Sequence, residues 1–478
     1  MVRAGERIHV IGIAGSGAAG VALLCARAGA IVDGCDADGA SPYTPPLAQV
    51  GVRVIDGHDP AHLSDVDRVA ISPAVRSVRD HPELAAAIAA GLPVITWQAL
   101  LGELMDAPGH IGLAVAGTHG KSTTTALLGH LLIGAGLDPT VEVGAVVAEW
   151  GSASVRPGAG APFVVEADEF GDNFLNYHPA AAILTNLEMD HPDFFADRGA
   201  VLDSFERFVR GMRPHTALGA VLLIAASGDP GLDELLARLR DLDLRIVRYG
   251  PGGSVVAGEV HLDADGTRFT LDGQPYRMGL AGSHNVLNAT AALHLAGELG
   301  AGRAALAGAL ATFRGAGRRM ERITDTGGVI VYDDYGHHPT EVRAALSAAR
   351  QLVGGRRLWA VFEPHMYSRT ALLAEEFATA FTDADEVVIA DIFASRDTPA
   401  AMRATSAEAL ADLVERVSAT PAIATGDVDA TTRYVADHLR AGDAVLVMGA
   451  GRSYRIARGL RDALEAGVLD ERRSMEGP

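Results

Sequence analysis

A glycine-rich segment after residue 116 combines the residue types that bind a phosphate group. An apolar strand pattern over residues 111–116 leads into it, and an apolar helical pattern follows it. Its residues are Gly117, Thr118, His119, Gly120, Lys121, Ser122 and Thr123. Backbone N–H groups at a helix start bind anions, a lysine adds a positive charge, and a serine hydroxyl can bind Mg²⁺. The segment predicts a nucleotide-binding loop. The strict P-loop pattern would have glycine at Val115, so an incidental glycine turn remains the alternative.

An earlier segment, Gly15 to Gly20 ("GSGAAG"), also lies between a strand pattern and a helical pattern. Asp36 ends the next strand pattern about 20 residues later, which is the spacing of a dinucleotide-binding fingerprint. An NAD-dependent oxidoreductase would have this segment, but it would not need a second phosphate loop farther along the chain. Two phosphate sites fit better with an enzyme that brings a nucleotide-linked substrate to ATP.

Strand and helix patterns alternate along the whole chain, which is typical of α/β domains with parallel sheets. A length of 478 residues exceeds what one hydrophobic core supports, and three domains are expected. Pro-Gly in residues 106–110 and the glycines of residues 315–319 mark the joints. We therefore expect α/β domains over residues 1–105, 106–315 and 316–478, with a small antiparallel insertion near residues 256–278.

Charge and cysteine content exclude several classes of partner and location. The formal charge of −20 provides no basic footprint for a nucleic acid or an anionic membrane. The two cysteines, Cys25 and Cys35, have no zinc-binding spacing, and they are expected to pack as small hydrophobic groups in a reducing compartment. Residues 8–26 are apolar like a signal peptide, but their glycines favour a phosphate-binding turn. The sequence predicts a soluble cytoplasmic protein.

Several motifs that follow the first loop occur in one order along the chain. They are "GTHGKSTTT", "EADEF", "TNLEMDH", "GSHNVLNATAA", "GAGRRME", "DDYGHHPTE" and "PHMYSRT", with "GIAGSGAAG" in front of them. This set closely resembles the Mur ligases over nearly the whole chain. Within that family it is most similar to the members that join L-alanine to UDP-N-acetylmuramate. Members that attach a preformed tripeptide to the same sugar are the nearest alternative.

The resemblance implies an N-terminal Rossmann-like domain for the UDP sugar, a central P-loop ATPase domain and a C-terminal Rossmann-like domain for the amino acid. It implies ATP and Mg²⁺ as cofactors. ATP would phosphorylate the lactyl carboxylate of UDP-N-acetylmuramate, and the amine of L-alanine would displace the phosphate in a step of peptidoglycan precursor synthesis. The partners would be these small molecules, and the chain would be a monomer or a homodimer.

The resemblance also assigns roles to particular residues. Lys121 would contact the β- and γ-phosphates of ATP. Mg²⁺ would be held by Ser122, Glu166 and His191, although Glu166 could belong to a solvated acidic turn and His191 could merely end a strand. ATP would further contact Asn288 and Arg319, with an ordinary capped helix and the neighbouring Arg318 as the respective alternatives. The expected UDP-sugar residues are Gly15, Gly17, Asp36 and Ser72. The expected amino-acid side consists of Tyr335, His337, His365 and Arg369, with His337 or Tyr335 orienting or deprotonating the amine.

Overall fold

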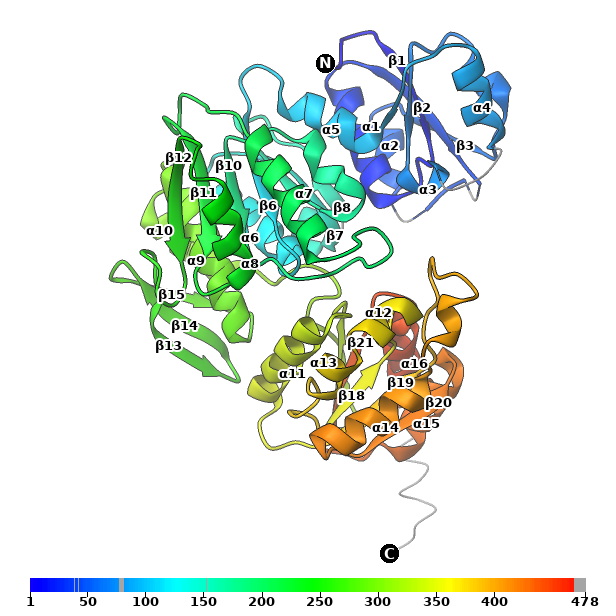
Figure 1. Cartoon of the computed structure of the whole chain (residues 1–478), viewed down its shortest axis with the longest axis vertical. Coiled ribbons are helices and arrows are strands. Elements are labelled where there is room, and N and C mark those ends of the chain that lie inside the picture. The colour runs from blue at the N-terminus through cyan, green and yellow to red at the C-terminus, as the bar shows by residue number, and fades with distance from the viewer. Residues whose placement is uncertain (38, 42, 77–80, 152, 468–478) are drawn as a thin grey trace, which may run out of the picture. The chain divides into compact units, whose positions relative to one another are not determined.

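The computed structural model describes residues 1–37, 39–41, 43–76, 81–151 and 153–467. Within them, three mainly parallel sheets with crossover helices and one small antiparallel sheet follow one another along the chain (Figure 1). Two compact units result. The first comprises Met1–Leu187, Leu202–Val256 and Thr290–Ala309, and the second comprises Glu188–Val201, Ala257–Ala289 and Leu310–Pro478. The predicted α/β class and the antiparallel insertion are confirmed, and the predicted domain boundaries stay predictions.

The N-terminal sheet has the strand order β3-β2-β1-β4-β5, and all of its pairs are parallel. Its strands are β1 (Arg7–Ile11), β2 (Ile31–Asp36), β3 (Arg53–Asp56), β4 (Arg68–Ile71) and β5 (Val94–Thr96). Its helices are α1 (Ser16–Arg27), α2 (Pro45–Gln49), η1 (Pro60–Leu63), α3 (Pro73–Arg76), α4 (Pro82–Ala89) and α5 (Trp97–Met105). The strand order reverses between β1 and β4, where open α/β sheets bind their ligands.

The central sheet has the order β12-β11-β10-β6-β9-β7-β8. Its strands are β6 (Ile111–Ala116), β7 (Thr140–Val147), β8 (Ala153–Arg156), β9 (Pro162–Ala167), β10 (Ala181–Leu184), β11 (Val221–Ala226) and β12 (Leu244–Tyr249). Its helices are α6 (Lys121–Gly134), η2 (Ala148–Trp150), η3 (Phe170–Asn176), α7 (Arg198–Gly211), α8 (Pro230–Arg238), α9 (Ser283–Glu298) and α10 (Arg303–Thr312). Strand β6 is almost entirely apolar and buried, as expected for a parallel strand covered on both faces. It pairs with β9 on one side and β10 on the other, so the loops after these three strands share one edge.

The small sheet and the C-terminal sheet complete the chain. The small antiparallel sheet contains β13 (Gly258–Asp263), β14 (Gly266–Leu271) and β15 (Gln274–Met278). The C-terminal sheet, in the order β16-β17-β21-β18-β19-β20, contains β16 (Glu321–Thr326), β17 (Val329–Asp334), β18 (Leu358–Phe362), β19 (Glu386–Ala390), β20 (Ala422–Gly426) and β21 (Ala444–Met448).

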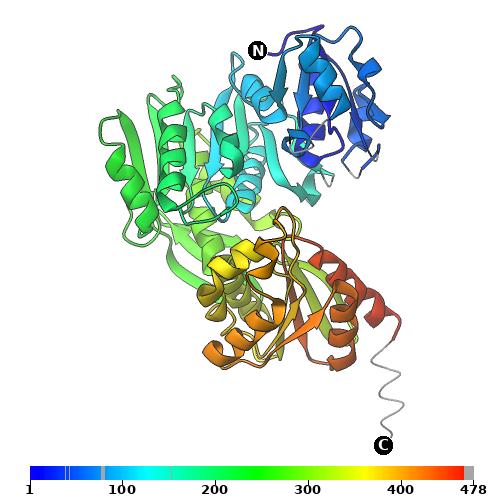
Figure 2. The same cartoon turned by 45° about the vertical axis from the view of Figure 1, so that its right-hand side comes forward.

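Helices cover both faces of the C-terminal sheet (Figure 2). They are α11 (Pro339–Val353), α12 (Tyr367–Leu372), α13 (Ala374–Ala378), η4 (Ala401–Arg403), α14 (Ala407–Ser418), α15 (Val428–His438) and α16 (Ser453–Glu465). Leu346 and Leu410 belong to the core on one face, and Val435 and Leu460 belong to the core on the other. Among the described residues, no helix has the length and apolar character needed to cross a membrane.

Candidate functional site

The loop between β6 and α6 depends on left-handed glycines and on the residues that follow β10. Gly117 has a φ of 137° and Gly120 a φ of 80°. The backbone N–H of His119 donates to Asn186 Oδ1 at 2.8 Å, and the Thr185 hydroxyl donates to the His119 carbonyl at 2.6 Å. The loop that contains the predicted ATP residues is therefore held by a neighbouring strand. Sequence analysis did not single out Thr185 and Asn186, although both begin the "TNLEMDH" motif.

Lys121 is the first residue of α6, directly after this loop, and is largely buried. Its Nζ donates to the Gly117 carbonyl at 2.6 Å and to Glu169 Oε2 at 2.7 Å, and it lies 3.6 Å from Asp168 Oδ1. Burial by itself lowers the pKa of Lys121, but Glu169 and Asp168 outweigh this effect and hold that pKa above its ordinary value. Burial raises the pKa of Glu169 to about 7, against the opposing charge of Lys121. Lys121 is therefore a fixed positive charge at physiological pH.

The structure brings Ser122 and Glu166 together, as the magnesium prediction requires. The Ser122 hydroxyl donates to Glu166 Oε1 at 2.8 Å, and the Gly144 N–H donates to Glu166 Oε2 at 2.6 Å. Burial raises the pKa of the nearby Glu142 carboxyl, and the charges of Glu166 and Asp168 raise it further. Negative charge is thus concentrated here, and hydroxyl and carboxylate oxygens are preferred Mg²⁺ ligands. These residues fit a magnesium ion. His191 belongs to the other compact unit, and its share in that site stays a prediction.

The predicted UDP-sugar residues lie at the carboxyl edge of the N-terminal sheet. Gly15 is the residue before α1, and an added Cβ at Gly17 would lie 2.5 Å from the Trp97 ring. The Asp36 carboxylate accepts a hydrogen bond from the Ala14 N–H at 3.1 Å, in the turn before α1. Ser72 directly follows β4, and its N–H donates to the Ile11 carbonyl at the end of β1. These residues lie at or after the ends of β1, β2 and β4, near the point between β1 and β4 where the strand order reverses and where open α/β sheets bind their ligands.

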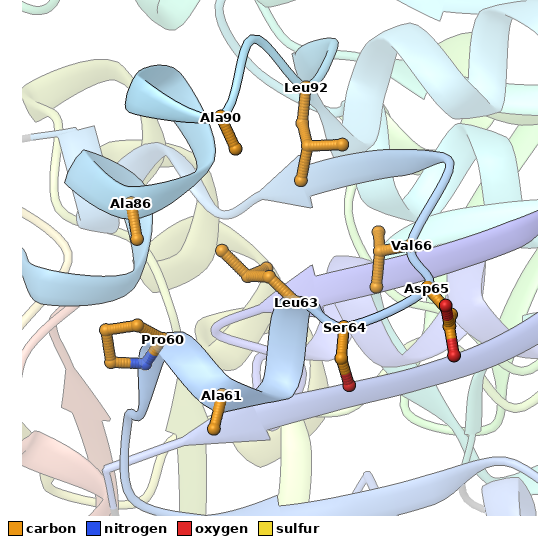
Figure 3. Close-up of a pocket in the computed structure, with 9 residues that line it drawn as sticks. All are labelled: Pro60, Ala61, Leu63, Ser64, Asp65, Val66, Ala86, Ala90 and Leu92. Carbon is orange, nitrogen blue, oxygen red and sulfur yellow. The ribbon is translucent and has the colours of Figure 1, made fainter.

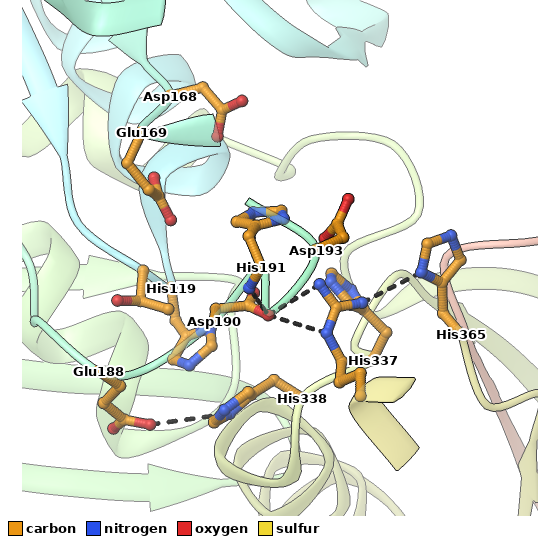
Figure 4. Close-up of polar contacts among 12 residues, drawn as sticks. His119, Asp168, Glu169, Glu188, Asp190, His191, Asp193, His337, His338 and His365 are labelled. Carbon is orange, nitrogen blue, oxygen red and sulfur yellow. Dashed lines mark hydrogen bonds and ion pairs between the residues drawn. The ribbon is translucent and has the colours of Figure 1, made fainter. Parts of the chain in front are cut away.

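In the second unit, Arg369 is buried in an ion pair with Asp190. Its Nε lies 2.8 Å and its Nη2 2.7 Å from Asp190 Oδ1, and its Nη1 lies 3.0 Å from His365 Nδ1. Figure 4 shows Asp190 and His365, the two residues that contact this guanidinium. Burial by itself raises the pKa of Asp190, but Arg369 outweighs it and holds that pKa well below its ordinary value. Sequence analysis missed Asp190, whose only signal is its place directly before His191.

His337 and His365 are held in the neutral form. The His337 Nδ1 lies 3.1 Å from the Tyr335 carbonyl, and the two histidine rings are 5.8 Å apart. Burial, helped by the positive charge of Arg369, lowers the pKa of His337 to about 3 and that of His365 to about 4. A base is most effective when its pKa is near the working pH. His337 is therefore better suited to orienting a group by hydrogen bonding than to removing a proton.

Asn288 and Arg319, the remaining predicted ATP residues, also lie in the second unit. Asn288 is buried in the second turn of α9. The guanidinium of Arg319 lies 5.1 Å from the centre of the Tyr335 ring. Arg318, the alternative to Arg319, donates to Asp333 at 2.8 Å and to the Gly449 carbonyl at 2.8 Å. Arg318 therefore has a structural role in the C-terminal sheet, which leaves Arg319 as the better candidate.

A shallow hollow lies on the surface of the N-terminal domain (Figure 3). Apolar side chains from η1, α4 and the adjoining loops dominate its lining, among them Leu63, Val66 and Leu92. None of the predicted site residues lines it, and its wall offers a single carboxylate, that of Asp65. We assign it no part in the chemistry.

Comparison with known families decides the assignment of the chain. The model described as Mur ligase family, catalytic domain, matches residues 7–108, the Mur ligase middle domain matches residues 115–296, and the Mur ligase, glutamate ligase domain, matches residues 318–451. The UDP-N-acetylmuramate–L-alanine ligase of Kineococcus radiotolerans is 40% identical over 455 residues, which are 93% of each chain. This chain belongs to the Mur ligase family.

Solved structures of Mur ligases have the same fold over almost the whole chain. The UDP-N-acetylmuramate-alanine ligase of Thermotoga maritima has a TM-score of 0.77 and 25% identity, covering 96% of this chain and 99% of its own. A murein peptide ligase of Psychrobacter arcticus has a TM-score of 0.66 and 27% identity with the same coverage. The predicted family and its three-domain α/β architecture are confirmed.

Replacing Gly117 with alanine should disrupt the predicted nucleotide-binding loop of this Mur ligase. The backbone there is left-handed, and an added Cβ would lie 2.1 Å from Thr185 Oγ1 and 3.0 Å from the Asn186 carbonyl. A strain of about 1–2 kcal/mol corresponds to roughly tenfold weaker ATP binding, measured by titration calorimetry. Gly297→Ala is the control, because its Cβ would enter open space. Equal affinities of both variants would contradict this account.

The neutral state of His337 predicts a specific pH dependence of stability. Between pH 6.5 and pH 4 the unfolded chain binds a proton at this histidine and the folded chain does not, so folding weakens as the pH falls. His337→Asn should make the fall in melting temperature over this range less steep. Burial raises the pKa of Asp334 to about 6, so this carboxyl group makes folding more stable as the pH falls. It does so in the wild type and in the variant alike, and its contribution cancels when the two slopes are compared. Equal slopes of melting temperature against pH for the variant and the wild type would refute the neutral state of His337. His261→Asn, at an exposed position, is the control.

Proposed function

We propose that this Mur ligase joins L-alanine to the lactyl carboxylate of UDP-N-acetylmuramate, with conversion of ATP to ADP and phosphate. The observation that carries the proposal is the Lys121 loop beside the Ser122–Glu166 pair, in a chain matched along 93% of its length by an L-alanine ligase at 40% identity. The reaction is a step of peptidoglycan precursor synthesis. Its substrates are small molecules.

The first chemical step brings together two anions, the lactyl carboxylate and the γ-phosphate of ATP. The protein must therefore hold them in the reactive orientation and neutralise their charge. Lys121 and the backbone N–H groups at the start of α6 bind the β- and γ-phosphates, and Asn288 and Arg319 complete the ATP site. Ser122, Glu166 and His191 would hold Mg²⁺, and the ion would neutralise negative charge on the phosphate oxygens. The lactyl carboxylate attacks the γ-phosphorus, the bond to the bridging oxygen breaks, and ADP leaves with that electron pair.

The second step forms the amide bond on the amino-acid side. The amine of L-alanine attacks the acyl carbon, and the bond from this carbon to the phosphate oxygen breaks. Inorganic phosphate leaves with the electron pair, and the nitrogen releases one proton to the solvent. We assign binding of the alanine carboxylate to Arg369 and orientation of the amine to His337, whose neutral imidazole accepts a hydrogen bond. Tyr335 and His365 line this side. Gly15, Gly17, Asp36 and Ser72 bind the UDP sugar at the edge of the N-terminal sheet.

An amino-acid panel separates this proposal from the attachment of a preformed tripeptide, the activity suggested by the murein peptide ligase neighbour. ADP release should require UDP-N-acetylmuramate and should be greatest with L-alanine. Glycine and L-serine test the selectivity for the methyl side chain. Faster turnover with L-alanyl-γ-D-glutamyl-diaminopimelate than with L-alanine would replace the proposal with the recycling reaction. No ADP release with any acceptor would reject the ligase activity.

Lys121 can be tested by substitution, because it is the chain's single lysine and no other lysine can replace it. Lys121→Ala should lower kcat for ADP release by about 100- to 1000-fold, the usual effect of removing one transition-state contact. Full activity of Lys121→Ala would contradict the role of this residue.

A further inference from the structure

A cluster of metal-ligating side chains lies in the N-terminal domain, apart from the proposed ATP and amino-acid sites. Its members are His9 in β1, Cys35 in β2, His62 in η1 and Glu83 in α4, and their donor atoms all lie within 4.8 Å of one another. His9, Cys35 and Glu83 are completely buried, and His62 is mostly buried. Four separate elements thus direct their polar groups to one point beside an apolar core that includes Ile11 and Ile71.

The orientation of His9 is that of a metal ligand. Its Nδ1 lies 2.7 Å from Asp33 Oδ1, while its Nε2 points into the cluster. This Nε2 finds no hydrogen-bond partner of suitable geometry among the described residues, although Glu83 Oε1 lies 3.0 Å away. A carboxylate on the outer nitrogen commonly fixes the tautomer and rotation of a zinc-bound histidine. Asp33 holds His9 in this arrangement.

The other three donors converge on the same point. Cys35 Sγ lies 2.8 Å from Glu83 Oε2, and His62 Nδ1 lies 2.9 Å from Glu83 Oε1. His58 lies beside them, with its Nδ1 3.1 Å from Cys35 Sγ. Donor atoms of a tetrahedral zinc site are about 3.3–3.7 Å apart. A cation would therefore move Glu83 by several tenths of an ångström away from the donors that it now contacts at 2.8–3.0 Å. That movement is small for side chains.

We propose that His9, Cys35, His62 and Glu83 bind one Zn²⁺ ion that fastens η1 and α4 to the N-terminal sheet. Two imidazoles, one thiolate and one carboxylate form a four-ligand set suited to zinc, and a closed set of this kind is structural. On binding, Cys35 loses its thiol proton and His9 loses any proton on Nε2, and both protons enter the solvent. Cys35 directly precedes Asp36, so the ion would stiffen the edge that we assign to the UDP sugar.

The alternative is a metal-free network in which Glu83 accepts hydrogen bonds from its neighbours. Burial by itself lowers the pKa of His9, but Asp33 and Glu83 outweigh it and raise that pKa to about 9. A protonated His9 beside an ionised Glu83 would satisfy the same atoms without a cation. The metal-free network and the zinc-bound cluster differ in metal content, so a measurement of zinc in the protein distinguishes them.

The experiment measures zinc in the full-length protein after chelation and dialysis against Zn²⁺ with excess Mg²⁺ present. The wild type should retain one zinc per chain, and its melting temperature should rise with free Zn²⁺. Cys35→Ser should lose the ion, while Cys25→Ser should keep it. Cys25 is equally buried but lies in α1, away from the cluster. Equal zinc contents in these two variants would overturn the proposal.

Cobalt substitution of the wild type keeps the test decisive if Cys35→Ser fails to fold. Co²⁺ in this site should show the visible absorption of a tetrahedral complex and a thiolate charge-transfer band. Absence of the thiolate band would overturn the proposal. Asp33→Asn should keep the spectrum but weaken Zn²⁺ binding by about 10- to 100-fold, the usual effect of losing such a histidine partner. Ligase activity is measured separately with Mg²⁺-ATP, so failure of either proposal is recognised independently.

Discussion

The proposed ATP site depends on the burial of one ammonium group among several carboxylates. A charge removed from water is stable only when it is paired and hydrogen-bonded. Lys121 meets this requirement through Glu169 and the carbonyl of its own loop. The carboxylates exceed what one lysine neutralises, as the raised pKa values of Glu142 and Glu169 indicate. This excess of negative charge is what the proposed Mg²⁺ ion would neutralise, next to the fixed positive charge of Lys121.

The same architectural rule positions the candidate residues in all three sheets. Parallel strands end at one edge, and loops from neighbouring strands meet there even when they are far apart in sequence. In the central sheet, β6 lies between β9 and β10, which places the lysine loop next to Glu166 and to Asn186. In the C-terminal sheet, β17 and β18 lie on either side of β21 and run parallel to it. The loops after β17 and β18 supply His337 and His365, whose ring centres are 5.8 Å apart.

In the second unit, the buried charge is a guanidinium group. Arg369 is almost completely buried, and Asp190 compensates its charge with a close ion pair. This arrangement fixes the backbone next to His191. The charge of the guanidinium also helps to keep the two nearby histidines neutral. One buried pair therefore determines the orientation of the loop and the protonation of the side chains around it.

The sequence by itself determined the α/β class, the phosphate loop and the family, because these depend on local periodicity, glycine positions and the order of motifs. Edge strands such as β8, β12 and β16 were harder to predict, since their sequences mix polar and apolar residues. Only the tertiary structure decided which distant residues touch. Ser122 and Glu166 are 44 residues apart, Asp190 and Arg369 are 179 apart, and the Cys35 cluster draws on four elements. Spacing along the chain carries no information on such contacts, because folding brings together loops and helices that are far apart in sequence.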